Sequence, residues 1–161
     1  MHEPSDTNLC KEYGVCKIVP ATLDHVYKLG PKLRHYDRME VGAFFTCNED
    51  ALLDGLEKDD QTYTGLDAQG EPFVMFGVGV ENNQPYIWLL GSKGIEENAL
   101  TFARQSKKIL PELIKPYGVV SNLVYADYGS SIKWLKWLGA KFLTKVEING
   151  YLFYEFIIIS Q

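Results

Sequence analysis

Residues 85–97 read PYIWLLGSKGIEE, and this stretch decides the fold. Its apolar run, residues 86–90, has the length and composition of a strand that is buried on both faces. A glycine turn at residues 91–94 follows, and helical spacing starts at about Ile95. Because the N–H groups of such a turn and of the first helical residues lack partners inside the helix, this unit can cradle an anion. An ordinary strand-to-helix connection has the same pattern, so the stretch alone leaves both interpretations open.

The whole chain has the size and composition of one globular domain. Of its 161 residues, 46% are hydrophobic and 13% are aromatic, which argues against disorder. A chain of this length buries enough surface to form a core without disulfides or metal. We expect a flexible tail over residues 1–12 and a single domain over residues 13–161.

Charge, apolar runs and cysteines exclude several classes of function. The net charge of −5, without a dense basic run, argues against binding to nucleic acid. No apolar run approaches the roughly 20 residues that span a bilayer and no signal pattern opens the chain, so no membrane role is predicted. The scattered Cys10, Cys16 and Cys47 favour free thiols in the cytoplasm, and with His2 they match no zinc-ligand spacing.

Local patterns predict a mixed sheet that is covered by helices. Strands are predicted at residues 15–19, 61–66, 71–80, 85–90, 119–126, 141–148 and 151–159, the last two joined by an Asn149-Gly150 turn. Helices are predicted at residues 23–29, 32–44, 51–57, 95–115 and 132–138, with Thr22 as a cap and a kink or break at Pro111. The expected fold is α/β, with a central, mostly antiparallel sheet of about seven strands and helices on both faces.

This order of elements resembles that of the GCN5-related N-acetyltransferase (GNAT) family over nearly the whole chain. The text WLKWLGAKF at residues 134–142 is similar to the family's segment (F/W)-(Y/L)-x-x-L-G-F. The resemblance implies a GNAT-like fold that binds acetyl-CoA (or CoA) along the strand and turn at residues 85–97. The thioester oxygen would meet an N–H near Leu89 or Leu90, and the pyrophosphate would meet the turn. The cofactor-binding residues that it implies are Leu89, Leu90, Gly91, Ser92, Lys93, Gly94 and Ile95.

Three short motifs resemble a narrower group, the GNAT-like proteins of tailed bacteriophages. They are Arg34-x-x-Asp37-x-x-Glu40-Val41, FGVG at residues 76–79 and IWLLGS at residues 87–92. That resemblance implies either an active acetyltransferase or an inactive protein of the same fold that acts in virion assembly or binds a host protein. It implies the host cytoplasm or the virion as the location.

Several positions depart from the GNAT pattern. The cofactor signature (Arg/Gln)-x-x-Gly-x-(Gly/Ala) is met only at Gly94, and Glu96 puts a carboxylate where a pyrophosphate should bind. Glu96 can equally be a favourable charge at a helix start. The family's asparagine after the next strand corresponds to Tyr128, and its thiolate-protonating tyrosine corresponds to Leu135, which cannot donate a proton. An active enzyme would therefore need another acid.

Attack of an amine on a thioester needs a base, a donor for the oxyanion and an acid for the leaving thiolate. Glu40 is the candidate base or amine-binding carboxylate, because Arg34, Asp37 and Glu40 lie near one helix face. A solvated, salt-bridged face is the alternative. Tyr128 is the candidate acid, or else an aromatic side chain packed at a strand end.

The sequence also suggests partners for this protein. An acidic surface would suit a small cationic amine or a protein lysine as the acceptor. The apolar ending at residues 156–159 can be interpreted as part of a homodimer interface or as a buried last strand.

Overall fold

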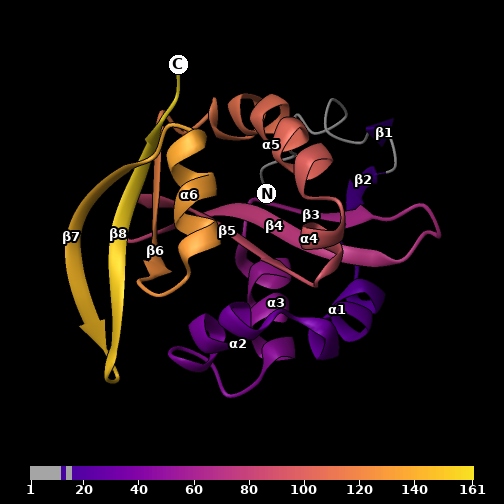
Figure 1. Cartoon of the computed structure of the whole chain (residues 1–161), viewed down its shortest axis with the longest axis horizontal. Coiled ribbons are helices and arrows are strands. Elements are labelled where there is room, and N and C mark those ends of the chain that lie inside the picture. Colours follow the sequence, from indigo (N-terminus) through magenta and orange to yellow (C-terminus); the bar gives the residue numbers. More distant parts are fainter. Residues whose placement is uncertain (1–11, 14–15) are drawn as a thin grey trace.

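One sheet organises the computed structural model, which describes residues 12–13 and 16–161 (Figure 1). Its strand order is β1-β2-β3-β4-β5-β6-β8-β7. Neighbouring strands run antiparallel except β5 and β6, which run parallel. The strands are β1 (Glu12–Tyr13), β2 (Cys16–Pro20), β3 (Gln61–Leu66), β4 (Pro72–Glu81), β5 (Gln84–Gly91), β6 (Val119–Tyr125), β7 (Lys141–Ile148) and β8 (Tyr151–Ile159).

Helices cover both faces of this sheet (Figure 1). On one face lie α1 (Leu23–Leu29), α2 (His35–Gly42) and α3 (Asn48–Lys58), with a short 3-10 helix, η2 (Gly30–Lys32), after α1. On the other face lie α4 (Gly94–Glu97), α5 (Ala99–Ile114) and α6 (Gly129–Trp137). The predicted α/β class is confirmed, and the two-residue β1 adds an eighth strand to the seven that were expected.

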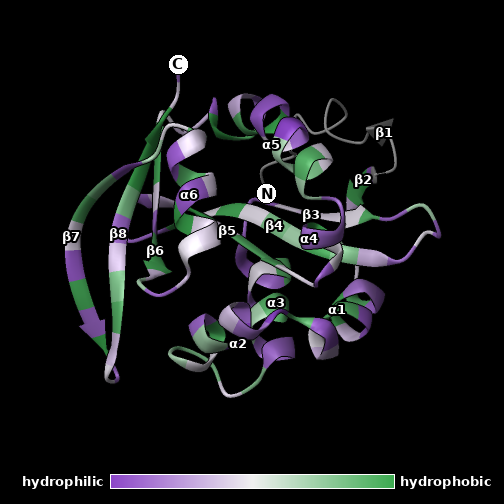
Figure 2. Cartoon of the chain, in the orientation of Figure 1, coloured by the Kyte–Doolittle hydropathy of each residue, from purple (hydrophilic) through white to green (hydrophobic). Residues whose placement is uncertain are grey.

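The central strand β4 belongs to both hydrophobic cores. Val74, Phe76 and Val78 pack into the core on the α5–α6 face, whereas Met75 packs into the core on the α1–α3 face. Because both faces are covered, β4 is a nearly continuous apolar run and not an alternating one. Figure 2 shows hydrophobic residues along the sheet and on the sides of the helices that face it.

Two short-range predictions are confirmed in detail. Thr22 caps α1: its hydroxyl accepts from His25 N–H at 3.3 Å, while Thr22 N–H donates to His25 Nδ1 at 3.1 Å. Asn149 and Gly150 have φ of 51° and 84°, the pair of positive angles that a two-residue hairpin turn requires.

Two predicted helices are divided. The segment 32–44 is interrupted because Leu33 is extended and pairs with Ser92 across an isolated bridge, so α2 starts only at His35. The segment 95–115 is broken at Asn98, with φ −122° and ψ 35°, and not at Pro111, which lies inside α5.

Some predictions concern parts of the chain that the structure does not describe. The predicted tail lies outside the described residues, apart from Glu12 in β1, and so do Cys10 and His2. Cys47 is a free, exposed thiol. Among the described residues, no helix combines the length and the apolar character needed to cross a membrane.

Candidate active site

The parallel strands β5 and β6 are paired at one register position, Tyr86 opposite Ser121. Just after β5, Ser92 N–H donates to Phe73 O at 2.9 Å, which extends the β4–β5 ladder by one pair. Because bonding alternates along an antiparallel ladder, even-numbered residues of β5 bond to β4. Odd-numbered residues of β5 therefore direct their N–H and C=O groups towards β6.

The same alternation defines the facing edge of β6. Ala126 N–H donates to Leu152 O at 2.9 Å, so even-numbered residues of β6 bond to β8 and odd-numbered residues face β5. Beyond the single paired position, Leu89 and Leu123 therefore face each other across a split in the sheet. Of the two donors predicted for a thioester oxygen, Leu89 N–H faces this split, whereas Leu90 N–H is directed to β4.

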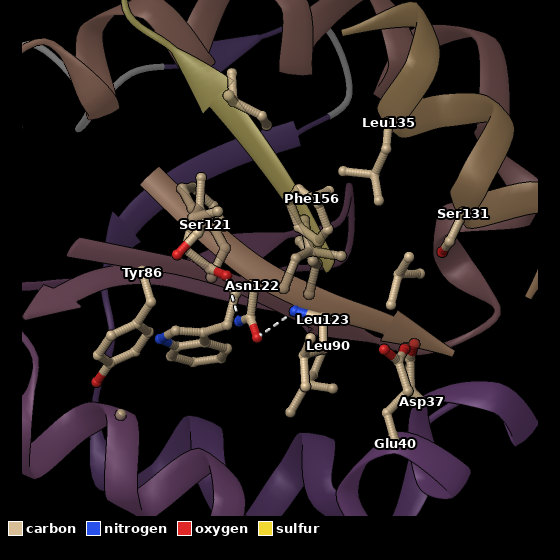
Figure 3. A pocket seen from close by; sticks show the side chains of 18 of the residues that line it. Asp37, Glu40, Tyr86, Leu90, Ser121, Asn122, Leu123, Ser131, Leu135 and Phe156 are labelled. Carbon is tan, nitrogen blue, oxygen red and sulfur yellow. Dashed lines mark hydrogen bonds between the residues drawn. The ribbon is translucent and has the colours of Figure 1, made fainter. Parts of the chain in front are cut away.

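A cavity of about 890 Å³ lies at the split and is lined from both faces of the sheet. Residues of α2 and α3 line it on one face, and residues of α5 and α6 line it on the other. Figure 3 shows the carboxyl groups of Asp37 and Glu40 close together on one side of this pocket, Tyr86 on the opposite side and Asn122 between them. The cavity at the gap in the sheet is therefore bordered by both helical layers.

Two carboxylates of α2 fill hydrogen-bonding positions at the wide end of the split. Asp37 Oδ2 accepts from Gly91 N–H at 2.9 Å, and Glu40 Oε2 accepts from Tyr125 N–H at 3.3 Å. Arg34 holds Asp37 with two bonds of 3.0 and 3.3 Å, and its own N–H donates to Gly91 O at 2.9 Å. The motif at residues 34–40 thus joins α2 to the ends of both diverging strands.

Burial shifts the protonation of both carboxylates. It raises the pKa of Asp37 above its ordinary range, although the Arg34 guanidinium and the Gly91 N–H oppose the rise. Burial, followed by the charge of Asp37, raises the pKa of Glu40 to about 8, against the Tyr125 N–H and Arg34. A carboxyl group with a pKa near the working pH can both accept and release a proton, as a general base must.

Tyr128 lies beside this carboxylate pair. Its side chain is only 2% exposed, its ring centroid is 4.9 Å from that of Tyr36, and the Arg34 guanidinium is 5.2 Å from its centroid. Among the described residues its hydroxyl has no hydrogen-bond partner, although Asp37 and Ser131 lie close to it. Burial and the charge of Asp37 raise the pKa of Tyr128, so its hydroxyl keeps a proton that it can donate.

Comparisons with known proteins identify the fold. No family model and no curated protein matches the sequence. A GNAT-family acetyltransferase from Bacillus anthracis superposes with a TM-score of 0.69 at 7% identity, covering 92% of this chain and 97% of that chain. The chain has the GNAT fold.

Two further solved structures agree. A GNAT-family acetyltransferase from Bordetella pertussis has a TM-score of 0.64 at 15% identity, with 91% of this chain and 96% of that chain covered. A GNAT superfamily phosphinothricin acetyltransferase from Sinorhizobium meliloti, solved in complex with acetyl-CoA, has a TM-score of 0.64 at 10% identity, with coverages of 91% and 89%. At these identities the likeness concerns the fold alone.

The predicted cofactor turn is present in this GNAT fold, but several of its N–H groups already have partners. Ser92 N–H donates to Phe73 O at 2.9 Å, Gly94 N–H to Ser92 Oγ at 3.2 Å and Ile95 N–H to Ser92 O at 3.1 Å. With the Gly91 N–H bonded to Asp37, four N–H groups of this stretch have partners, all of which lie outside the helix. A phosphate would have to displace internal bonds to be bound there.

The remaining residues of the predicted site have different surroundings. Lys93 and Glu96 are exposed, and Lys93 lines a second cavity, of about 520 Å³, together with Lys32 and Arg38. Leu135 is buried on α6 and lines the main cavity about one turn after Ser131 (Figure 3). No group of three His, Cys, Asp or Glu side chains arranged to hold a metal occurs among the described residues.

Further acidic side chains, outside α2, line the main cavity. Asp59 accepts hydrogen bonds from the Tyr86 hydroxyl and the Trp88 indole, and burial raises the pKa of Asp59 against both bonds. Lys58, the one cation among the described lining residues, pairs with Asp54 at 2.5 Å. The carboxylates lining the cavity outside α2 are Asp54, Asp59, Glu81 and Glu155.

One residue at the split was missed by the sequence reasoning. Asn122 lies inside β6, and its carboxamide bonds to both diverging strands. The signal was present as a polar Ser121-Asn122 pair within the otherwise apolar stretch VVSNLVY. A polar pair in a predicted buried strand requires hydrogen-bond partners, and that requirement could have drawn attention to it.

Proposed function

We propose that this protein is an acyl-CoA-dependent N-acyltransferase that transfers an acetyl group directly to an amine held in the same cavity. The observation that carries the proposal is the split between β5 and β6, where Leu89 N–H faces a cavity that is bordered by both helical layers. Leu89 and Leu123 lie on the two facing strand edges, beyond the position where these strands pair. Backbone groups on such edges can bond to the amides of an extended pantetheine arm. Acetyl-CoA would supply the acetyl group as a thioester.

The chain's own residues can provide the three functions that the reaction needs. Leu89 N–H would donate to the thioester oxygen as that oxygen gains negative charge. Glu40 would take a proton from the amine nitrogen as the carbon–nitrogen bond forms and the carbon–sulfur bond breaks. Tyr128 would give its hydroxyl proton to the departing sulfur and regain one from solvent. The observation that favours this role is that its hydroxyl lies close to Asp37 and Ser131, which line the cavity.

The acceptor that we propose is a cationic primary amine, either a small polyamine or a protein lysine. Among the described residues, four carboxylates outside α2 line the cavity, and the one lining cation, Lys58, is paired with one of them, Asp54. These carboxylates would attract a second positive charge on the acceptor. That second charge would then lie away from Glu40, while the reacting amine lies next to it. A neutral amine would gain nothing from them.

A second candidate function is a GNAT-fold protein that binds a partner without transferring an acyl group. Two observations favour this second function: N–H groups of the turn at Gly91 to Ile95 already have hydrogen-bond partners, and the Leu135 side chain cannot donate a proton. The phage-like motifs make a virion or host protein the partner for which we would search first. Of these motifs, the segment at residues 34–40 and β5 meet at the split.

A transfer assay tests the leading proposal. The purified protein is incubated with acetyl-CoA and spermidine, a lysine peptide or glycinamide, and the released CoA thiol is measured. Thiol release should be fastest with spermidine or the lysine peptide and should be lost in Glu40→Gln. The matched variant Glu147→Gln, at an exposed position on β7, should keep the rate. No release with any amine, together with capture of a virion or host protein, would support the second candidate instead.

A further inference from the structure

The Asn122 carboxamide stands between β5 and β6 at the point where their pairing stops. Its Nδ2 donates to Ile87 O at 2.6 Å, and its Oδ1 accepts from Leu123 N–H at 2.7 Å (Figure 3). Asp37 and Glu40 each bond to one of the two strands, and they do so from α2. Asn122 is therefore a bridge between the two strands that comes from within the sheet itself.

The strand register shows which bond this side chain replaces. With Tyr86 opposite Ser121, the parallel ladder would continue by a bond from Leu123 N–H to Ile87 O. Leu123 N–H and Ile87 O are each directed towards the other strand, but each is bonded to the Asn122 carboxamide instead. The side chain has thus been inserted into the first ladder position that the sheet does not make.

The inserted carboxamide determines how far apart Leu123 N and Ile87 O can lie. A direct backbone bond joins nitrogen and oxygen at about 2.9 Å. Two hydrogen bonds in series with a carboxamide whose oxygen and nitrogen are about 2.2 Å apart allow up to roughly 7.5 Å. A carboxamide can do this because it donates from one end and accepts at the other, which matches a carbonyl on one strand and an N–H on the next.

We propose that Asn122 is a positioning residue that holds β5 and β6 apart and so keeps the acyl-donor slot open before any ligand binds. The consequence for the reaction rests on the function proposed above, in which the slot accepts the pantetheine arm. Without the wedge, Leu123 N–H would bond directly to Ile87 O, and Leu89 N–H, the next donor on that edge, would bond to Leu123 O. The donor for the thioester oxygen would then be consumed by the sheet.

The test measures the strands and the ligand separately. Amide hydrogen exchange at Leu89, followed by NMR in the ligand-free protein, reports whether the edge is open. In Asn122→Ala we expect Leu89 exchange to slow by about tenfold or more, because its N–H gains a ladder partner. The dissociation constant for CoA, measured by calorimetry, should rise by about tenfold or more.

Two further variants guard against an effect of unfolding. Asn122→Asp can accept from Leu123 but cannot donate to Ile87, so the strands should stay apart and Leu89 exchange should stay fast. Ser121→Ala removes the neighbouring hydroxyl, whose contact with Pro85 O is 3.5 Å, and should leave Leu89 exchange unchanged. Both variants should show the wild-type pattern of exchange elsewhere in the sheet.

The outcomes separate this inference from the proposed function. Unchanged Leu89 exchange in a folded Asn122→Ala protein would overturn the wedge, whatever the protein binds. Slowed exchange with unchanged CoA affinity would overturn the positioning role. If the wild-type protein binds no CoA, the proposed function fails, and the exchange measurement still decides whether Asn122 holds the strands apart.

Discussion

Glu40 should make the folded protein less stable as the pH rises. Its pKa of about 8 in the folded protein lies above its ordinary value of 4.5, so between these values the folded state keeps a proton that the unfolded chain has released. The stabilisation is therefore complete below about pH 4.5 and is lost as the pH rises through 8. The free energy of unfolding should fall by about 1.4 kcal/mol per pH unit over most of this window.

Glu40→Gln removes this contribution because glutamine does not titrate. Between pH 6 and pH 8, the wild-type protein should lose about 2 kcal/mol more unfolding free energy than the variant. Urea unfolding of both proteins at four pH values measures the difference, and Glu147→Gln on the exposed β7 position should follow the wild-type curve. Parallel curves for the wild type and Glu40→Gln would refute the argument that Glu40 is protonated in the folded state.

The same pKa should be visible in the reaction. The kcat/KM for transfer should rise with pH to a plateau, with an apparent pKa of about 8, because the base form of Glu40 is needed. Asp37→Asn should move this limb to lower pH, since the charge of Asp37 is one of the causes that raise the pKa of Glu40. If the rise of kcat/KM with pH persists in Glu40→Gln, another group is the base.

Three other perturbations follow from the geometry. Tyr128→Phe should lower kcat by about a hundredfold or more at unchanged CoA affinity in calorimetry, and an equal kcat would rule it out as the acid. Asp37→Asn should cost about 3 to 5 kcal/mol in urea unfolding, because it leaves a half-buried guanidinium without its carboxylate, and a loss below 1 kcal/mol would contradict the bidentate contact. Gly55→Ala should cost about 1 to 3 kcal/mol, since its Cβ would collide with Trp88 Cζ2, whereas Gly42→Ala, with open space around it, should cost nothing.

The strands could be predicted from the sequence because each carries its own local pattern. The run at residues 86–90 and the positive angles of Asn149-Gly150 depend on neighbours in the chain, and both were found at the predicted positions. One helix interruption depended on a distant contact: Leu33 is held extended by Ser92, which lies 59 positions away in the chain. No spacing rule within residues 32–44 contains that information.

Only part of the site could be predicted from the sequence, because the rest depends on how distant strands pair. Glu40 and Tyr128 both lie close to Asp37 in the structure, and their roles stay predictions. Which N–H faces the split depends on the pairing register, so Leu89 could not be separated from Leu90 by sequence alone. The wedge at Asn122 depends on a register that ends after one position, which no local pattern encodes.

Calorimetric titration with acetyl-CoA, and with CoA in parallel, measures whether an acyl donor binds between β5 and β6. We expect micromolar binding by the wild-type protein, with binding lost when Leu123→Trp fills the split. Trp137→Leu, at an exposed position of α6, should bind as the wild type does. An absence of binding up to millimolar concentration, or binding that Leu123→Trp leaves intact, would contradict an acyl-donor site between β5 and β6.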